Sequence, residues 1–147
     1  MEIKKSEEIL AEVHRNCQLA LQSISDILPE TEDNELREEL MRQHEEYERI
    51  GGRAALLARE RNIELKNHNP FKKAMMWGGI KMNAMKDDSR AHIAEMMVQG
   101  TVMGVTALRS TLAEMSDDYA DEEIKGLAEE LLRAEEQFEK KWKMLMA

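Results

Sequence analysis

The chain is poor in the residues that cross-link or interrupt a fold. It contains one cysteine, Cys17, in 147 residues, so no disulfide can form within the chain. A free cysteine on an apolar stripe packs into a core, and we expect a reducing, cytoplasmic location. Only two prolines and seven glycines are present, which leaves no room for a disordered linker. We therefore expect a single helical-bundle domain that spans residues 1–147.

Long apolar runs and an excess of basic charge are also absent. No segment reaches the roughly 18 uncharged apolar residues of a membrane span, and the N-terminus lacks the apolar stretch of a signal peptide. The 21 basic residues are outnumbered by 30 acidic residues, which gives a net charge of −9. That charge repels phosphate backbones and anionic lipid surfaces. We expect no nucleic-acid partner and no membrane partner.

Helical periodicity is the main positive signal. Apolar residues recur at alternating steps of three and four over residues 3–28, 33–66 and 119–146. Pro29 and the polar turn at residues 30–35 end the first helix, and Pro70 follows the second. The polar loop at residues 116–121 precedes the last helix and can cap it.

The third helical region extends from residue 71 to residue 115 in one register. A straight helix of that length would measure about 68 Å, so we expect it to be bent or broken near residues 78–89. The break can lie at Gly78-Gly79 or at Asp87-Asp88-Ser89, and we favour the second because Ser89 can cap a new helix. The conformation of residues 70–88 stays open. Residues 93–108 are almost free of charge and predict a central helix that protein covers on nearly every side.

The expected fold is all-α. Four antiparallel helices with short turns make an up-down-up-down four-helix bundle. In that topology, the turn at residues 30–35 and the loop at residues 116–121 lie at the same end.

A strip of polar residues follows the third helix. His92, Glu95 and Gln99 recur at steps of three and four, and Glu95 interrupts the apolar run. A buried carboxylate must pair, hold a metal or take up a proton. We counted residues along each helix from the end where the turn at residues 30–35 and the loop at residues 116–121 are expected. By that count, polar residues of the other three helices lie at a similar height to this strip. The resulting candidate metal ligands are His14, Glu46, His92, Glu95 and Glu135, with Gln99 as a hydrogen-bonding neighbour of the ligands.

The simpler alternative for Glu95 is an internal ion pair or a hydrogen-bonded strut. Gly51 and Gly100 fall at nearly the same level as the polar residues. Glycines there mean either close helix packing or room for an ion, a water molecule or a small ligand.

The segment SRAHIAEMMVQGTVMGV at residues 89–105 resembles segments of small, uncharacterised ferritin-like four-helix-bundle proteins of anaerobic Gram-positive bacteria. The resemblance implies a ferritin-like fold and no particular activity. Ferritin-like di-iron proteins place a glutamate three residues before a histidine on two helices. None of the four histidines here has that glutamate, since the residues at this position are Ala11, Met41, Leu65 and Ser89.

Two functions remain open. The sequence favours a soluble, non-enzymatic interaction or self-associating module, with a homodimer or another protein as partner and residues 62–88 as the contact region. The alternative is a ferritin-like protein that binds iron or manganese inside the bundle. The sequence contains no phosphate-binding glycine loop, no nucleophile elbow and no zinc-ligand spacing, so it points away from an enzyme.

Overall fold

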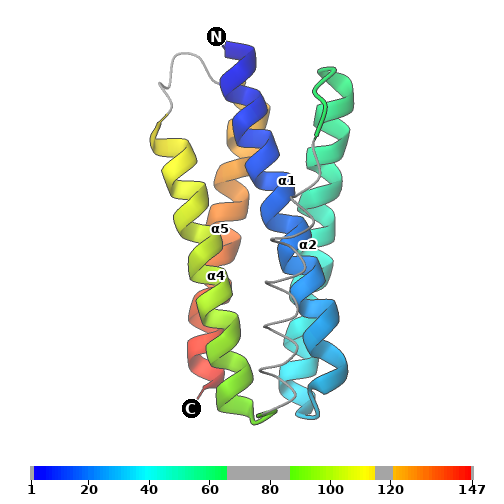
Figure 1. Cartoon of the computed structure of the whole chain (residues 1–147), viewed down its shortest axis with the longest axis vertical. Helices are drawn as coiled ribbons and strands as arrows, with labels where there is room; N and C mark the ends of the chain where they lie inside the picture. Colours follow the sequence, from blue (N-terminus) through cyan, green and yellow to red (C-terminus); the bar gives the residue numbers. More distant parts are fainter. Residues whose placement is uncertain (1, 66–86, 115–120, 147) are drawn as a thin grey trace.

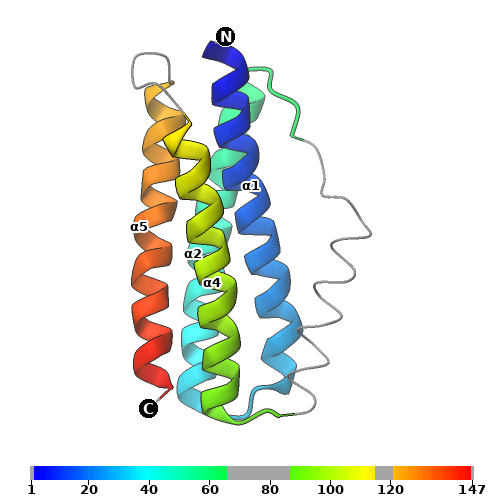
Figure 2. The same ribbon diagram turned by 60° about the vertical axis from the view of Figure 1, so that its left-hand side comes forward.

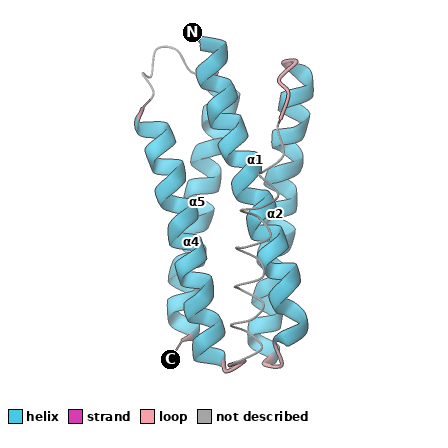
Figure 3. Cartoon of the chain, in the orientation of Figure 1, coloured by secondary structure: helices cyan, strands magenta, loops and turns pink. Residues whose placement is uncertain are grey.

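The computed structural model describes residues 2–65, 87–114 and 121–146. Within these ranges the protein consists of helices, with no strand (Figure 3). Four α-helices and one short 3-10 helix follow in the order α1 (Glu2–Ile27), η1 (Leu28–Glu30), α2 (Asn34–Glu60), α4 (Arg90–Ala113) and α5 (Glu122–Leu145). The predicted all-α, four-helix architecture is confirmed.

Side-chain caps begin three of these helices. The carboxylate of Asp33 accepts the backbone N–H of Leu36 at 3.1 Å at the start of α2. Asp121 does the same for the first turn of α5, and Ser89 for that of α4. The prediction that a new helix starts after Ser89 is confirmed. Residues 71–86 of the expected third helical region lie outside the described residues.

The second helix ends earlier than the sequence predicts, at Glu60 instead of near residue 66. Asn62 has a φ of 55°, in the left-handed region that asparagine tolerates. Its N–H donates to the carbonyl of Arg59 at 3.3 Å, and the N–H of Ile63 donates to the carbonyl of Ala58 at 2.8 Å. These are the two bonds of a Schellman motif, which satisfies the last carbonyls and turns the chain out of the helix.

The expected up-down-up-down order of the helices is wrong. The α1–α2 pair and the α4–α5 pair are each antiparallel, but α2 and α4 point the same way (Figures 1 and 2). Arg90 at the start of α4 bonds Asp33 at the start of α2, whereas Arg61 at the end of α2 bonds Asp121 at the start of α5. Asp33 before α2 and Asp121 before α5 therefore lie at opposite ends of the bundle, whereas the expected order places them at the same end.

The core lies between the four helices, where α1 packs against α2 and α4 while α5 packs against α4 and α2. The predicted apolar stripe of α2 is buried at every position. Cys17 is buried and unpaired, as its place on the stripe of α1 predicts. No described helix is both long enough and apolar enough to cross a lipid bilayer. The fully buried large side chains include Trp142, Ile9, Leu10, Ile24, Leu40, Ile50, Ile93, Leu108 and Leu127.

Within the described part of the chain, one face of α4 stays exposed, so the chain itself does not cover this helix on nearly every side as the sequence predicts. The helix contacts mainly α5 and α1, which cover only its inner side. Its buried residues are Ile93, Ala94, Met97, Thr101, Val105 and Leu108. We define the α4 outer face as its exposed residues, which are Ala91, Glu95, Gln99, Gly100, Val102, Met103, Thr106, Arg109, Ser110 and Ala113.

Candidate functional site

A polar cluster lies in the middle of the core and takes one residue from each α-helix. The side-chain amide of Asn16 donates to Glu135 Oε1 at 2.9 Å and to the carbonyl oxygen of Gly104 at 3.1 Å. The Tyr47 hydroxyl donates to Glu135 Oε2 at 2.8 Å. Glu135 is only 1% exposed, so the protein supplies the partners of both carboxylate oxygens.

The electrostatics of this cluster follow from its burial. Both donors to Glu135 are neutral, and desolvation raises the pKa of its carboxyl to about 7, while the hydrogen bonds from Tyr47 and Asn16 oppose the rise. Burial and the charge of Glu135 also raise the pKa of Tyr47 and the pKa of Cys17. Glu135 is therefore the group of this cluster that titrates near neutral pH.

Gly104 makes the space that the cluster occupies. A Cβ atom at this position would lie 2.7 Å from Glu135 Oε2 and 2.9 Å from Asn16 Oδ1. At Gly51, a Cβ would lie 3.3 Å from Cys17 Cβ, a tight contact between α2 and α1. A Cβ at Gly100 would meet nothing within 4 Å. Of the two glycines highlighted by the sequence, Gly51 reflects close packing and Gly100 lies on the surface.

A second buried network ties α2 to α5. The indole N–H of Trp142 donates to Gln43 Oε1 at 3.0 Å, and the amide of Gln43 donates to Glu39 at 2.9 Å. Glu39 also forms an ion pair with Arg42. Gln43 is the polar residue in the otherwise apolar stripe of α2, and it serves as the hydrogen-bond partner that the buried indole needs.

The polar strip of α4 does not enter the core. Glu95 and Gln99 are exposed, so the prediction of a buried carboxylate at Glu95 is wrong. His92 is half-buried near the start of α4, where its ring lies 3.9 Å from Asp87. The error has a physical reason: composition placed this strip inside the bundle, whereas it lies on the side of α4 that no described helix covers.

The candidate ligands of α1 and α2 have hydrogen-bond or ion-pair partners outside the polar cluster. His14 is half-buried and lies 3.2 Å from Gln18 Nε2, and burial lowers its pKa. Glu46 forms an ion pair with Arg49, which lowers the pKa of that carboxyl.

Of the five candidate ligands, Glu135 alone is buried. Across residues 2–65, 87–114 and 121–146, no three His, Cys, Asp or Glu side chains come together in a way that could hold a metal ion. The structure therefore does not assemble the predicted ligand set. Residues at a similar height on different helices need not have side chains that meet at one point.

Sequence reasoning missed Asn16 and Tyr47 as the partners of Glu135. A signal for Glu135 is present, since Leu131, Glu135 and Phe138 follow at steps of four and three along the buried face of α5. Ala134, one position away, also fits the three-and-four spacing between Leu131 and Phe138, so the pattern alone does not single out Glu135.

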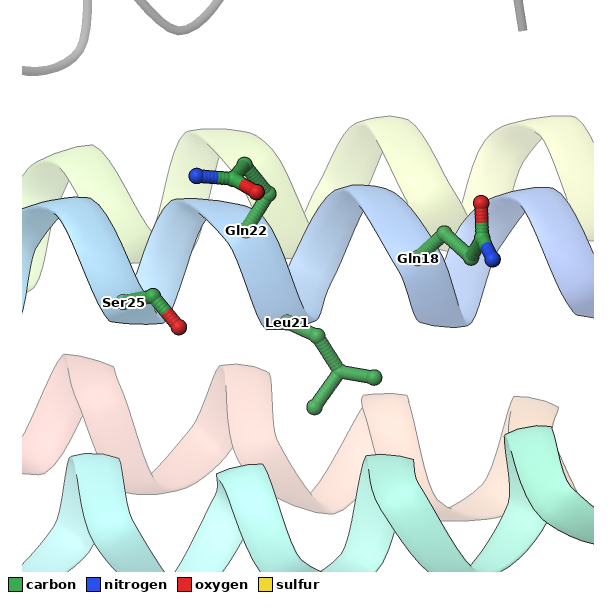
Figure 4. Close-up of a pocket in the computed structure, with 4 residues that line it drawn as sticks. All are labelled: Gln18, Leu21, Gln22 and Ser25. Carbon is green, nitrogen blue, oxygen red and sulfur yellow. The ribbon is translucent and has the colours of Figure 1, made fainter. Parts of the chain in front are cut away.

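A shallow depression of about 240 Å³ lies beside α1. Figure 4 shows its lining, which consists of Gln18, Leu21, Gln22 and Ser25, all from α1. The side-chain amide of Gln22 already donates to Asp26 at 3.0 Å. With two amides, one hydroxyl and one leucine, this lining offers neither a set of metal ligands nor a general acid or base.

Comparisons of the chain with models of protein families, with curated proteins and with solved structures each found no match.

Proposed function

We propose that this protein is a non-enzymatic helical-bundle module that acts through protein–protein contact at the α4 outer face. Most of the contact region that the sequence predicts, residues 62–88, lies outside the described residues. The observation that carries this proposal is the near absence of charge on that face. Of its ten exposed residues, two are charged, Glu95 and Arg109, whereas nine of the fourteen exposed residues of α2 are charged. Val102 and Met103 lie at its centre and are 39% and 62% exposed.

The contrast matters because the whole chain carries a net charge of −9. Burying a charged side chain without a partner costs several kcal/mol, so the centres of interfaces are depleted in charge and enriched in methionine and aromatic residues. Five of the eight exposed residues of α5 are charged as well. Among the exposed sides of α2, α4 and α5, the α4 outer face therefore has the smallest free-energy cost of burying charged side chains when a partner covers it.

The polar cluster supports a structural role over a catalytic one. A general acid or base must reach the substrate within hydrogen-bonding distance. Glu135 is 1% exposed, and both of its oxygens accept hydrogen bonds from the protein. The cluster instead links all four α-helices, as a buried polar network that fixes their register would.

We propose further that the bundle is ferritin-like. Parallel α2 and α4 require a long crossover connection, and a single such connection is typical of ferritin-like folds.

Binding of iron or manganese is the alternative function, and the topology is the observation that favours it. Plasma mass spectrometry after loading with iron or manganese tests it: near-stoichiometric metal that is lost in Glu135→Gln would establish that alternative.

Site-specific photo-crosslinking in living cells tests the contact surface. A photoreactive amino acid replaces Met103 on the α4 outer face or, as the control, Met41 on α2, two methionines that are 62% and 55% exposed. We expect protein adducts from position 103 and few from position 41. No adduct at position 103, or equal adduct formation at both positions, would contradict the proposed function.

A further inference from the structure

We infer that the α4 outer face binds a second copy of this chain, with the two α4 helices antiparallel about a two-fold axis at Val102. The inference rests on the proposed function and names its partner. It follows from the order of residues along the face. Glu95, Gln99, Val102, Thr106 and Arg109 follow at steps of four, three, four and three, so they share one strip of the helix.

The charges of this strip are self-complementary. Glu95 and Arg109 lie on opposite sides of Val102 at equal separations in sequence, about 10 Å along the helix axis. In an antiparallel pair, Glu95 of each copy faces Arg109 of the other copy. In a parallel pair, each charge would face its own like charge. A two-fold interface brings one surface against itself, so an opposite-charge pair placed symmetrically about the axis is the pattern that it needs.

Both charged groups are available for a partner. Glu95 forms no ion pair within the described part of the chain, and its side chain is exposed. Arg109 is 61% exposed and bonds Glu136 of α5 through one nitrogen, Nη2, at 3.0 Å. Since a guanidinium carries five N–H donors in a planar fork, Arg109 can bond a second carboxylate.

The centre of the strip suits close helix packing. Thr106 and Ser110 are small, and Met103 is a flexible side chain that can fill the remaining space. Small residues let two helix backbones approach each other.

The size of the contact sets the expected strength. A helix of this length extends about 36 Å. Two such helices paired along one strip bury an area near the lower end of specific interfaces, about 1,200 Å² in total. We therefore expect a reversible dimer with a micromolar dissociation constant rather than an obligate one.

Sedimentation equilibrium of charge-exchange variants tests the partner and its orientation. Either Glu95→Arg or Arg109→Glu alone creates two like-charge contacts in an antiparallel dimer and should weaken it roughly tenfold. The double variant should return the dissociation constant to within about twofold of wild type. Met103→Glu should abolish the dimer, whereas Met41→Glu on α2 should not. Melting curves confirm that each variant is folded.

The outcomes separate this inference from the proposed function. A wild-type chain that stays monomeric up to millimolar concentration overturns the inference, and so does a double variant that does not recover. If the photo-crosslinks from position 103 then join a different protein, the proposed function stands without the homodimer. If position 103 gives no adduct at all, both fail.

Discussion

Glu135 is the residue whose environment has the clearest consequence for stability. Its carboxyl has a pKa of about 7 in the folded protein and an ordinary value of 4.5. Between these pH values the folded state holds a proton that the unfolded state releases. The resulting stabilisation is fully present below about pH 4.5 and is lost as the pH rises through about 7.

The Glu135→Gln variant should remove this pH dependence. We expect wild type to lose up to about 3 kcal/mol of unfolding free energy through Glu135 between pH 5 and pH 8. The glutamine variant should lose less and should be the more stable protein at pH 8, because it buries no charge. Urea unfolding at several pH values measures both effects. Glu136→Gln, a change at the half-buried neighbour, serves as the control, and equal slopes for wild type and Glu135→Gln would refute the prediction.

Two glycines of α4 offer a matched test of the polar cluster. Gly100→Ala should stabilise the protein by up to about 1 kcal/mol, because alanine favours helix and the added methyl group meets nothing. Gly104→Ala gains the same propensity, but its Cβ would lie 2.7 Å from Glu135 Oε2 and displace a buried hydrogen bond. We expect Gly104→Ala to be about 1–3 kcal/mol less stable than Gly100→Ala.

Thermal and urea unfolding measure this difference between the two alanine variants. Equal stability would mean that the cluster relaxes without cost and does not hold the helices in register.

At the scale of the element, Asp121 has two roles at the start of α5. Its carboxylate accepts the backbone N–H groups of Glu123 and Ile124, and it also bonds Arg61 beyond the end of α2 at 2.7 Å. Arg61 is the main cause that lowers the pKa of Asp121.

Substitution at Asp121 can separate these roles. Asp121→Ala should cost about 1–2 kcal/mol, since it removes both the cap and the ion pair. Asp121→Asn keeps the cap and should recover most of that loss, because a half-buried ion pair that solvent still reaches contributes about 1 kcal/mol or less. Chemical denaturation of both variants measures the split, and an asparagine variant as unstable as the alanine variant would show that the ion pair dominates.

The sequence predicts the individual helices well because periodicity records which side of a helix faces the core. Leu40, Tyr47 and Leu57 are buried as their spacing predicts, and Ser89 caps a new helix. Periodicity does not record how many sides are covered. The outer side of α4 is almost as free of charge as its inner side, so composition alone could not place Glu95 on the surface.

At the scale of the whole molecule, helix direction is the feature that the sequence did not reveal. Reversing a helix leaves its apolar stripe unchanged, so the same pattern fits an up-down-up-down bundle and the observed order. The sequence predicted only part of the polar cluster, because helix direction also decides which residues meet across the bundle. Glu135 was included among the candidate residues, but its partners Asn16 and Tyr47 depend on which faces meet across the bundle.

The charge distribution of the whole molecule restricts where a second copy can bind. Ion pairs within the chain occupy charged residues at the two ends of the bundle: Arg90 bonds Asp33 at one end, and Arg61 bonds Asp121 at the other. The exposed sides of α2 and α5 are mostly charged. The α4 outer face has one charge of each sign, so two acidic molecules can approach there without opposing like charges.

Disulfide trapping at Val102 tests the central claim most directly. In the inferred dimer the two-fold axis passes through this residue, and helix axes 8–10 Å apart bring facing Cα atoms within the range of about 4.4–6.8 Å that a disulfide spans. Under mild oxidation, Val102→Cys should give a covalent dimer, while Met41→Cys on α2 should stay monomeric and the buried Cys17 should not react. If Val102→Cys remains monomeric, or cross-links no faster than Met41→Cys, then α4 does not pair with its own copy about this axis.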